Sequence, residues 1–286
     1  MCSTTRLQQK GRDLSLRISH ISVFVVSVFT VHFAAAQIRV SPVAFYLDDH
    51  DRNGRLYIEN GGNQDKDVVI DIRFGYPVSD DSGRVSFRFM DSLSPDEPSA
   101  AGWISVFPQS FTLPAGTSQT VAVMSTPPSG LADGEYWARP VLTFRSSSNI
   151  SQTAGDIENE TQLVLSVNYR HGSVFTGISP EGISLERSKQ KVSAVVQMTR
   201  TGNAAFLGNL VCRLIAGGVT VGQETSEVAV YHSLKKRIDF SVPDAGTGDF
   251  VVEAELNSKR EGNKPGDILQ TVTAVGREEF VLVGTR

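Results

Sequence analysis

Cysteine is almost absent from this chain of 286 residues, which holds only Cys2 and Cys212. Cys2 lies in an N-terminal leader, so removal of the leader leaves Cys212 without a partner for an internal disulfide. A fold stapled by disulfides is thereby excluded. Cys212 lies in an apolar, strand-like run, which predicts a buried and unreactive thiol.

Motifs that carry catalysis are also missing. The chain has no Gly-x-Ser-x-Gly elbow, no glycine loop that could cradle a phosphate and no carboxylate pair in a glycosidase context. The one mixed cluster of Asp and His, residues 48–52, joins two expected strands and indicates a polar turn rather than a metal site. We therefore expect no enzymatic activity, no cofactor, no bound metal and no small-molecule substrate.

A strong excess of positive charge is lacking as well. The first 36 residues hold four of the 27 basic and one of the 31 acidic residues, so the remaining chain carries 23 basic and 30 acidic residues, a net charge of −7. A mildly acidic chain of this kind argues against nucleic acid and anionic lipid as partners.

The N-terminal segment has the pattern of a secretion signal. Basic residues from Arg6 to Arg17 precede an apolar run, Ile18 to Phe33, and Ala34-Ala35-Ala36 offers small residues for signal peptidase. We expect a signal peptide over residues 1–36 and a mature protein in the periplasm. The apolar run approaches the roughly 17 to 25 residues that span a bilayer, so an uncleaved inner-membrane anchor is the alternative.

The rest of the chain is dominated by alternation of apolar and polar residues at period two. Trp103 to Met124 and Asp133 to Phe144 show it most clearly, with turn residues at Pro114-Ala-Gly116 and Asp133-Gly134. No segment has the pattern of a three-turn helix. Further strands are expected at 38–48, 55–59, 68–76, 85–89, 162–170, 191–200, 208–215, 227–232, 236–242, 250–256 and 278–283.

The 250 residues after the leader suggest two domains. A polar stretch, 146–161, interrupts the strands, and His171-Gly172 marks a hinge after one further strand. We expect an all-β protein of two immunoglobulin-like β-sandwich domains, at residues 37–170 and 171–286, because short strands recur every 8 to 12 residues.

Several segments resemble the PapD-like periplasmic pilus assembly chaperones. In the first half the resemblance lies in Ile104-Ser-Val-Phe-Pro108, Phe111-Thr-Leu113, Gly116, Gln119-Thr-Val-Ala-Val123, Asp133-Gly-Glu-Tyr136 and Val167-Asn-Tyr-Arg170. In the second half, Thr199-Arg-Thr-Gly-Asn203, Gly208-Asn-Leu210 and Val228-Ala-Val-Tyr231 resemble a divergent branch, often found with spore-coat-like subunits. The resemblance covers most of the chain after the leader.

The resemblance implies a molecular chaperone for pilus or fimbrial subunits. Such a chaperone lends an edge strand to a subunit whose own sandwich lacks its last strand. In the cleft between the chaperone's domains, an Arg and a Lys bind the subunit's terminal carboxylate. The implied partners are a pilus or coat protein subunit and an outer-membrane usher.

The family's functional residues match this chain only in part. The donated strand maps onto Ile157, Asn159, Thr161, Leu163 and Leu165, where two polar residues interrupt the apolar series. Leu163, Leu165 and Val167 could instead belong to the protein's own core. The cleft Arg falls at Pro42 and the cleft Lys near Ser166, so Arg39 and Arg170 are the nearest candidate carboxylate anchors.

A second hypothesis stays open: a structural or surface-adhesion protein that retains the fold without chaperone activity. Tyr136 and Trp137 are adjacent on one strand and point to opposite faces. One of them is expected in the core, and the other could belong to an exposed recognition face.

Overall fold

The computed structural model describes residues 38–90, 94, 96–146, 160–188, 191–240, 248–260, 264 and 266–282. The chain divides into two units, Met1–Ala35 and Ala36–Arg286, and every described residue belongs to the second. The expected signal peptide and its alternative as an anchor fall outside the described residues. Among the residues described, no helix is long and apolar enough to cross a membrane.

Nearly all of the described chain is strand, as the alternating pattern predicts. The first twelve strands are β1 (Ile38–Ser41), β2 (Ala44–Asp48), β3 (Asn53–Asn60), β4 (Lys66–Arg73), β5 (Gly75–Ser79), β6 (Val85–Phe89), β7 (Ile104–Phe107), β8 (Ser110–Leu113), β9 (Ser118–Ser125), β10 (Gly134–Ser146), β11 (Thr161–Val164) and β12 (Ser166–His171). The remaining seven are β13 (Ile178–Ser188), β14 (Lys191–Arg200), β15 (Phe206–Ala216), β16 (Val219–Val230), β17 (Ser233–Phe240), β18 (Gly248–Asn257) and β19 (Ala274–Leu282).

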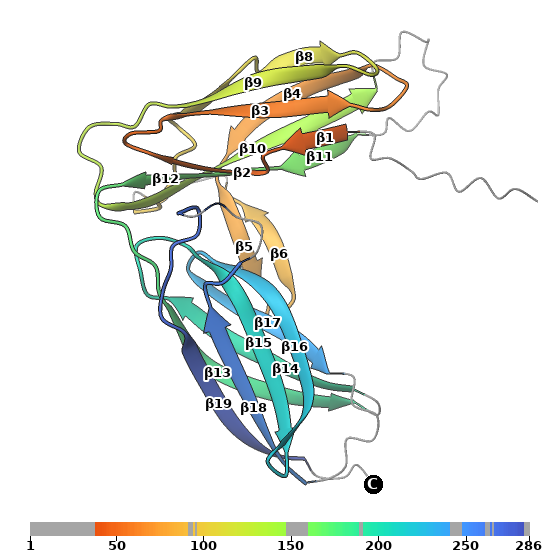
Figure 1. Cartoon of the computed structure of the whole chain (residues 1–286), viewed down its shortest axis with the longest axis vertical. Helices are drawn as coiled ribbons and strands as arrows, with labels where there is room; N and C mark the ends of the chain where they lie inside the picture. Colours follow the sequence, from red (N-terminus) through yellow and green to blue (C-terminus); the bar gives the residue numbers. More distant parts are fainter. Residues whose placement is uncertain are drawn as a thin grey trace, which may run out of the picture. The chain divides into compact units, whose positions relative to one another are not determined.

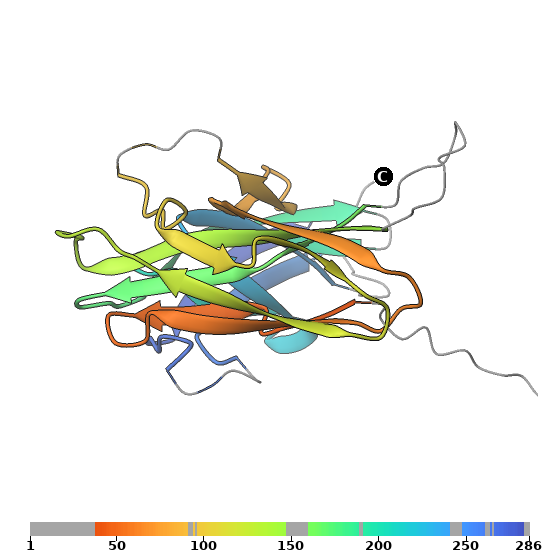
Figure 2. The ribbon, with the colours of Figure 1, turned by 90° about the horizontal axis from the view of Figure 1, so that it is seen from above.

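The first sandwich consists of two sheets (Figures 1 and 2). One has the strand order β1-β3-β9-β7, and the other has β2-β12-β10-β4-β8, with β11 also paired to β10. Because side chains alternate along a strand, each strand turns one face inward. On β3, Leu56 and Ile58 are fully buried, whereas their neighbours Arg55 and Tyr57 are exposed. Their core also contains Val121, Leu142 and Val167.

The second sandwich is built from the strands that follow. Its sheets have the orders β13-β14-β17 and β16-β15-β18-β19, and a separate core joins them around Phe206, Leu214 and Phe240. Cys212 lies in this core, where burial raises the pKa of its thiol to about 12. The predicted burial of the cysteine is confirmed, and so is the all-β fold of two sandwiches. The domain limits at residues 170 and 171 stay a prediction.

Several strands differ from those that the pattern predicts, and two of the differences lie at β13 and at Phe74. Strand β13 was not expected, because Pro180 and Gly182 interrupt its alternation, and the ladder with β14 shifts register at that point. The expected strand 68–76 is divided at Phe74: its first part is β4, and its last residues start β5, which pairs with β6 as a separate hairpin.

A third cluster of buried residues joins the two sandwiches. Phe74 and Trp137 come from the first, and Ala205, Leu207 and Tyr231 come from the second. The indole of Trp137 is completely buried and lies edge-on to Tyr231, with ring centroids 4.6 Å apart. Tyr136 packs against the first core instead. The expectation that one of the two residues forms an exposed recognition face is therefore wrong, because the second sandwich covers Trp137.

Candidate functional site

The long strand β10 positions the candidate site, because two strands share one of its edges. Its residues 141–144 pair with β11, and its residues 134–138 pair with β12. Leu165 separates β11 from β12 and lies opposite Pro140. The carbonyl of Pro140 accepts a hydrogen bond from the Leu165 amide, but Pro140 has no N–H to donate in return, so the ladder is interrupted there.

Strand β2 covers the outer edge of β12 and begins just past the C-terminal end of β11. It runs parallel to β12, from Ala44 opposite Ser166 to Asp48 opposite Arg170. Before Pro42 the chain belongs to the other sheet, as β1 on β3. In the part of the chain that the structure describes, β11 has no second partner strand.

The backbone groups on the open edge of β11 follow from the alternation of the ladder. The amide of Leu165 points to β10, and the amide of Ser166 points the other way, to the carbonyl of Val43. Residues of the same parity as Ser166 therefore turn their N–H and C=O groups outward. On β11 these residues are Gln162 and Val164, which offer a short row of unpaired donors and acceptors.

The predicted client-binding residues lie at different depths. Thr161 is exposed, Leu163 is half-buried against the first core, and Leu165 is 1% exposed within that core. Ile157 and Asn159 fall outside the described residues. Leu163 and Leu165 thus occupy the protein's own core, as the alternative allowed, and a role of this segment in client binding stays a prediction.

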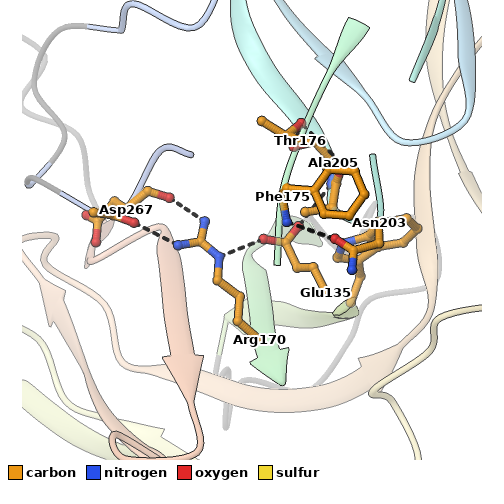
Figure 3. A network of polar contacts seen from close by, with 10 residues as sticks. Glu135, Arg170, Phe175, Thr176, Asn203, Ala205 and Asp267 are labelled. Carbon is orange, nitrogen blue, oxygen red and sulfur yellow. Dashed lines mark hydrogen bonds and ion pairs between the residues drawn. The ribbon is translucent and has the colours of Figure 1, made fainter. Parts of the chain in front are cut away.

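Neither candidate carboxylate anchor is placed to receive a ligand readily. Arg39 is a surface residue whose guanidinium lies 3.6 Å from the carboxylate of Glu59 on the neighbouring strand. Arg170 is engaged between the sandwiches (Figure 3): its Nε donates to Glu135, and its two terminal nitrogens donate to the carbonyls of Gly266 and Asp267. Its role as an anchor stays a prediction.

Glu135 is the centre of that network. Its side chain is 1% exposed and accepts bonds from Arg170, from the indole of Trp137 and from the amide of Ala205. Close by, Asn203 accepts a bond from the amide of Phe175 and donates to the carbonyl of Asp133. These bonds tie β10 and β12 to the second sandwich.

A buried arginine that the sequence reasoning missed, Arg139, does line a cavity. Its residue is 2% exposed, and it lines a cavity of about 340 Å³ on the outer face of β10 and β12. Its Nε donates to the carbonyl of Gly75 at 2.9 Å, and its Nη1 donates to the hydroxyl of Ser166 at 2.7 Å. Its Nη2 is buried and has no hydrogen-bond partner.

Two more polar groups with unmet bonding capacity line this cavity, which we call the Arg139 pocket. The Oδ1 of Asn168, a residue 1% exposed, and the Nε of Arg260 are both buried without a partner. Arg260 also lies 3.5 Å from Glu227, whereas no acidic side chain of the described chain forms an ion pair with Arg139. Burial raises the pKa of the neighbouring Tyr46 to about 12, so its phenol stays neutral.

The electrostatics of the pocket favour an anionic ligand. A buried charge without a counterion is costly, and a buried polar group without a partner adds to that cost. A carboxylate at Nη2 of Arg139 would satisfy the guanidinium, and Asn168 Oδ1 would accept an N–H from the same ligand. The rim is apolar, with Val43, Phe87 and Val164 partly exposed around it.

Arg139 carried a signal that could have been found in the sequence. Glu135, Trp137 and Arg139 alternate along β10, so they share the face opposite the first core. A tryptophan flanked by charged residues on the same strand face indicates that protein covers this face. The charged side chains there are available for ion pairs or for a ligand. Ser166, near which the resemblance places the cleft Lys, lies opposite Arg139 on the neighbouring strand. The positive charge at this place therefore comes from β10 rather than from β12.

No protein-family model matches this chain, and no curated protein does so either. Solved structures do match. The YadV chaperone is 13% identical, with a TM-score of 0.44, over 86% of this chain and 100% of that chain. The SafB chaperone with the SafA pilin of Salmonella enterica is 12% identical, with a TM-score of 0.41, over 86% and 96%. The CsuC–CsuE complex of Acinetobacter baumannii, from archaic chaperone-usher Csu pili, is 10% identical, with a TM-score of 0.43, over 84% and 98%.

In fold, this chain is similar to pilus chaperones. At identities of 10 to 13% the similarity concerns the fold alone. The roles of individual residues therefore have to come from the contacts of this chain.

Proposed function

We propose that the protein is a periplasmic, non-enzymatic chaperone that binds a pilus or coat subunit by strand addition along β11. The observation that carries the proposal is the open outer edge of β11, which ends beside the Arg139 pocket. A client strand on that edge would pair with Gln162 and Val164 and bring its chain end to Arg139. Val164 belongs to both features, because it is part of β11 and lines the pocket, and the resemblance of the sequence points to the same function.

The sizes of the available interactions favour main-chain pairing over side-chain insertion. Two outward residues offer up to four hydrogen bonds, worth roughly 0.5 to 1.5 kcal/mol each. A carboxylate on Arg139 adds about 1.5 to 3 kcal/mol, as hydrogen bonds to charged groups do. Among the described residues of β11, Val164 is the large apolar side chain left exposed, at 39%. We expect a client held by its backbone and its carboxylate.

Complex formation tests the proposal. The mature protein is mixed with a pilus subunit that lacks its last strand, and with the same subunit completed by a fused copy of that strand. We expect a one-to-one complex with the incomplete subunit only, measured by size-exclusion chromatography with light scattering. Self-assembly of the protein without either subunit would favour the structural or adhesion hypothesis, and no complex with the incomplete subunit would refute the proposal.

The charge of Arg139 gives a sharper test of the pocket. In Arg139→Met we expect client binding to weaken about tenfold or more, because the carboxylate loses its charge-assisted bonds. Folding should survive within about 1 kcal/mol, since an apolar replacement of a buried charge is often tolerated. Arg55→Met, at an exposed position on β3, is the matched control and should bind normally. Unchanged binding in Arg139→Met would remove the pocket from the account.

A further inference from the structure

The β5–β6 hairpin leaves the first sandwich and contacts the second (Figure 1). The amide of Arg237 on β17 donates to the carbonyl of Gly83 at 3.0 Å, and the amide of Lys235 donates to the hydroxyl of Ser79 at 2.7 Å. The ammonium of Lys235 also lies 2.6 Å from the carboxylate of Asp81. We call the bonds at Ser79 and Gly83 the latch.

Glycine is required at the tip of the latch. Gly83 has φ of +77°, and a Cβ there would lie 2.7 Å from the backbone nitrogen of Arg237. Both the backbone conformation and the space therefore exclude a side chain at this position. The turn is shaped by Asp80, whose carboxylate accepts bonds from Ser82 and from the amide of Arg84.

The inner side of the same hairpin forms one wall of the Arg139 pocket. Pro77 and Phe87 lie opposite each other across the two strands, and both line the pocket. Arg139 binds the carbonyl of Gly75 at the base of the hairpin, and its guanidinium carbon lies 6.0 Å from the centre of the Phe87 ring. The hairpin is thus attached at both ends, to Arg139 at its base and to β17 at its tip.

The pocket consequently combines a cationic floor with apolar sides. Leu207, Ala229 and Tyr231 of the second sandwich complete the lining beside Pro77 and Phe87. Such a lining suits an apolar side chain attached to a carboxylate. An acidic side chain would find only the buried Nε of Arg260, whose guanidinium already lies 3.5 Å from Glu227, to offset its loss of water.

We propose that the β5–β6 hairpin is the specificity wall of the Arg139 pocket, held against β17 by the latch, and that the pocket selects a chain end with a free carboxylate and an apolar last side chain. This inference rests on the proposed function, in which the pocket receives the end of a client. The latch would set the position of Phe87 and hence the selectivity of the pocket.

Three synthetic peptides test the selectivity. They share a body of alternating threonine and valine residues and end in a phenylalanine acid, a phenylalanine amide or an aspartic acid with a free carboxylate. We expect the mature protein to bind the phenylalanine acid about tenfold more tightly than either of the other two peptides. The amide loses the charge-assisted bond to Arg139, and the aspartate peptide loses the burial of an aromatic ring.

Two variants, each with a matched control, test the wall and the latch. Gly83→Ala should expose the Arg237 amide to hydrogen exchange and abolish the preference for phenylalanine over aspartate. Gly130→Ala is its control, because Gly130 has a similar φ of +80° but open space around it. Phe87→Ala should abolish the same preference while the Arg237 amide stays protected. Phe107→Ala, at a residue 70% exposed, is the control for that change.

The outcomes separate this inference from the proposed function. Equal affinity for the phenylalanine and aspartate ends, with the acid still preferred over the amide, would refute the wall alone. An unchanged preference in Phe87→Ala, or in a Gly83→Ala protein that has lost protection at Arg237, would also refute it. Retained protection at Arg237 in Gly83→Ala would refute the latch. A wild-type protein that binds none of the peptides would count against the use of the pocket by a client, and so against both proposals.

Discussion

At the scale of single residues, the charged side chains between the sandwiches differ in whether they have an ion-pair partner. Glu135 is buried and pairs with the partly buried Arg170, whereas Arg139 is buried with one nitrogen unpartnered. The sequence shows which residue types are present, but not which of them a second domain will cover. Arg39 and Arg170 were chosen as anchors by nearness along the chain, and Arg139 was missed because its strand neighbour Ser166 belongs to a segment 27 residues away.

His232 lies at the contact between the sandwiches, and we expect it to make that contact sensitive to pH. Its imidazole lies 3.5 Å from the carboxylate of Glu97 and beside the rings of Tyr76 and Trp137. Burial lowers the pKa of His232 below its ordinary value of 6.5, Arg200 lowers it further, and Glu97 opposes both. Between the lowered pKa and 6.5 the unfolded chain binds more protons than the folded protein.

The stabilising effect of a neutral His232 is therefore fully present above pH 6.5 and is lost as the pH falls toward the lowered pKa. We expect the Tm of the wild type to fall between about pH 7.5 and about pH 5, and the fall to be smaller in His232→Gln. Thermal unfolding followed by circular dichroism across this range measures both. Equal pH dependence in the two proteins would show that His232 does not contribute.

At the scale of secondary structure elements, the sequence predicts most strands and few of their relationships. Alternation at period two locates β3, β9, β10, β14 and β18 within a few residues. It cannot reveal that β2 starts opposite Ser166, or that residues 75–89 form a hairpin against β17, because both depend on contacts between distant segments. The described part of the predicted client-binding segment includes β11, and its inward side chains Leu163 and Leu165 belong to the first core or pack against it.

A proline on β11 tests the open edge. Gln162→Pro removes an N–H that points away from β10, so it should weaken client binding about tenfold or more while costing no bond within the sheet. Gln162→Thr keeps the N–H and is the matched control, which should bind like the wild type. Binding is measured by titration with the incomplete subunit, and unfolding in urea verifies the fold. If the proline variant binds normally, the client does not pair with β11.

At the scale of the whole molecule, the two sandwiches are joined by buried polar bonds as well as by aromatic packing. The network around Glu135 contacts both sandwiches and is almost fully satisfied by Arg170, Trp137 and Ala205. Length and the polar interruption before β11 predicted two sandwiches, but not this joint. The residues of the joint are scattered over β10, β12 and the loops of the second sandwich. No local sequence pattern therefore predicts the joint.

Removing Glu135 should disturb the whole molecule. Glu135→Ala leaves the partly buried Arg170 without its counterion and the buried indole of Trp137 without an acceptor, so we expect a loss of about 3 kcal/mol in the free energy of unfolding. Glu59→Ala breaks the exposed pair with Arg39 and should cost at most about 1 kcal/mol. Urea unfolding followed by tryptophan fluorescence compares the two. A similar small loss in both variants would mean that the network is not a structural joint.

The exchange of backbone amide hydrogens along β11 tests strand addition most directly. In the free protein the outward amides of Gln162 and Val164 should exchange quickly, while the inward amide of Leu163 is protected by β10. On binding an incomplete pilus subunit, Gln162 and Val164 should become protected, and the completed subunit should leave them unchanged. A stable complex in which both amides still exchange as fast as in the free protein would contradict the account.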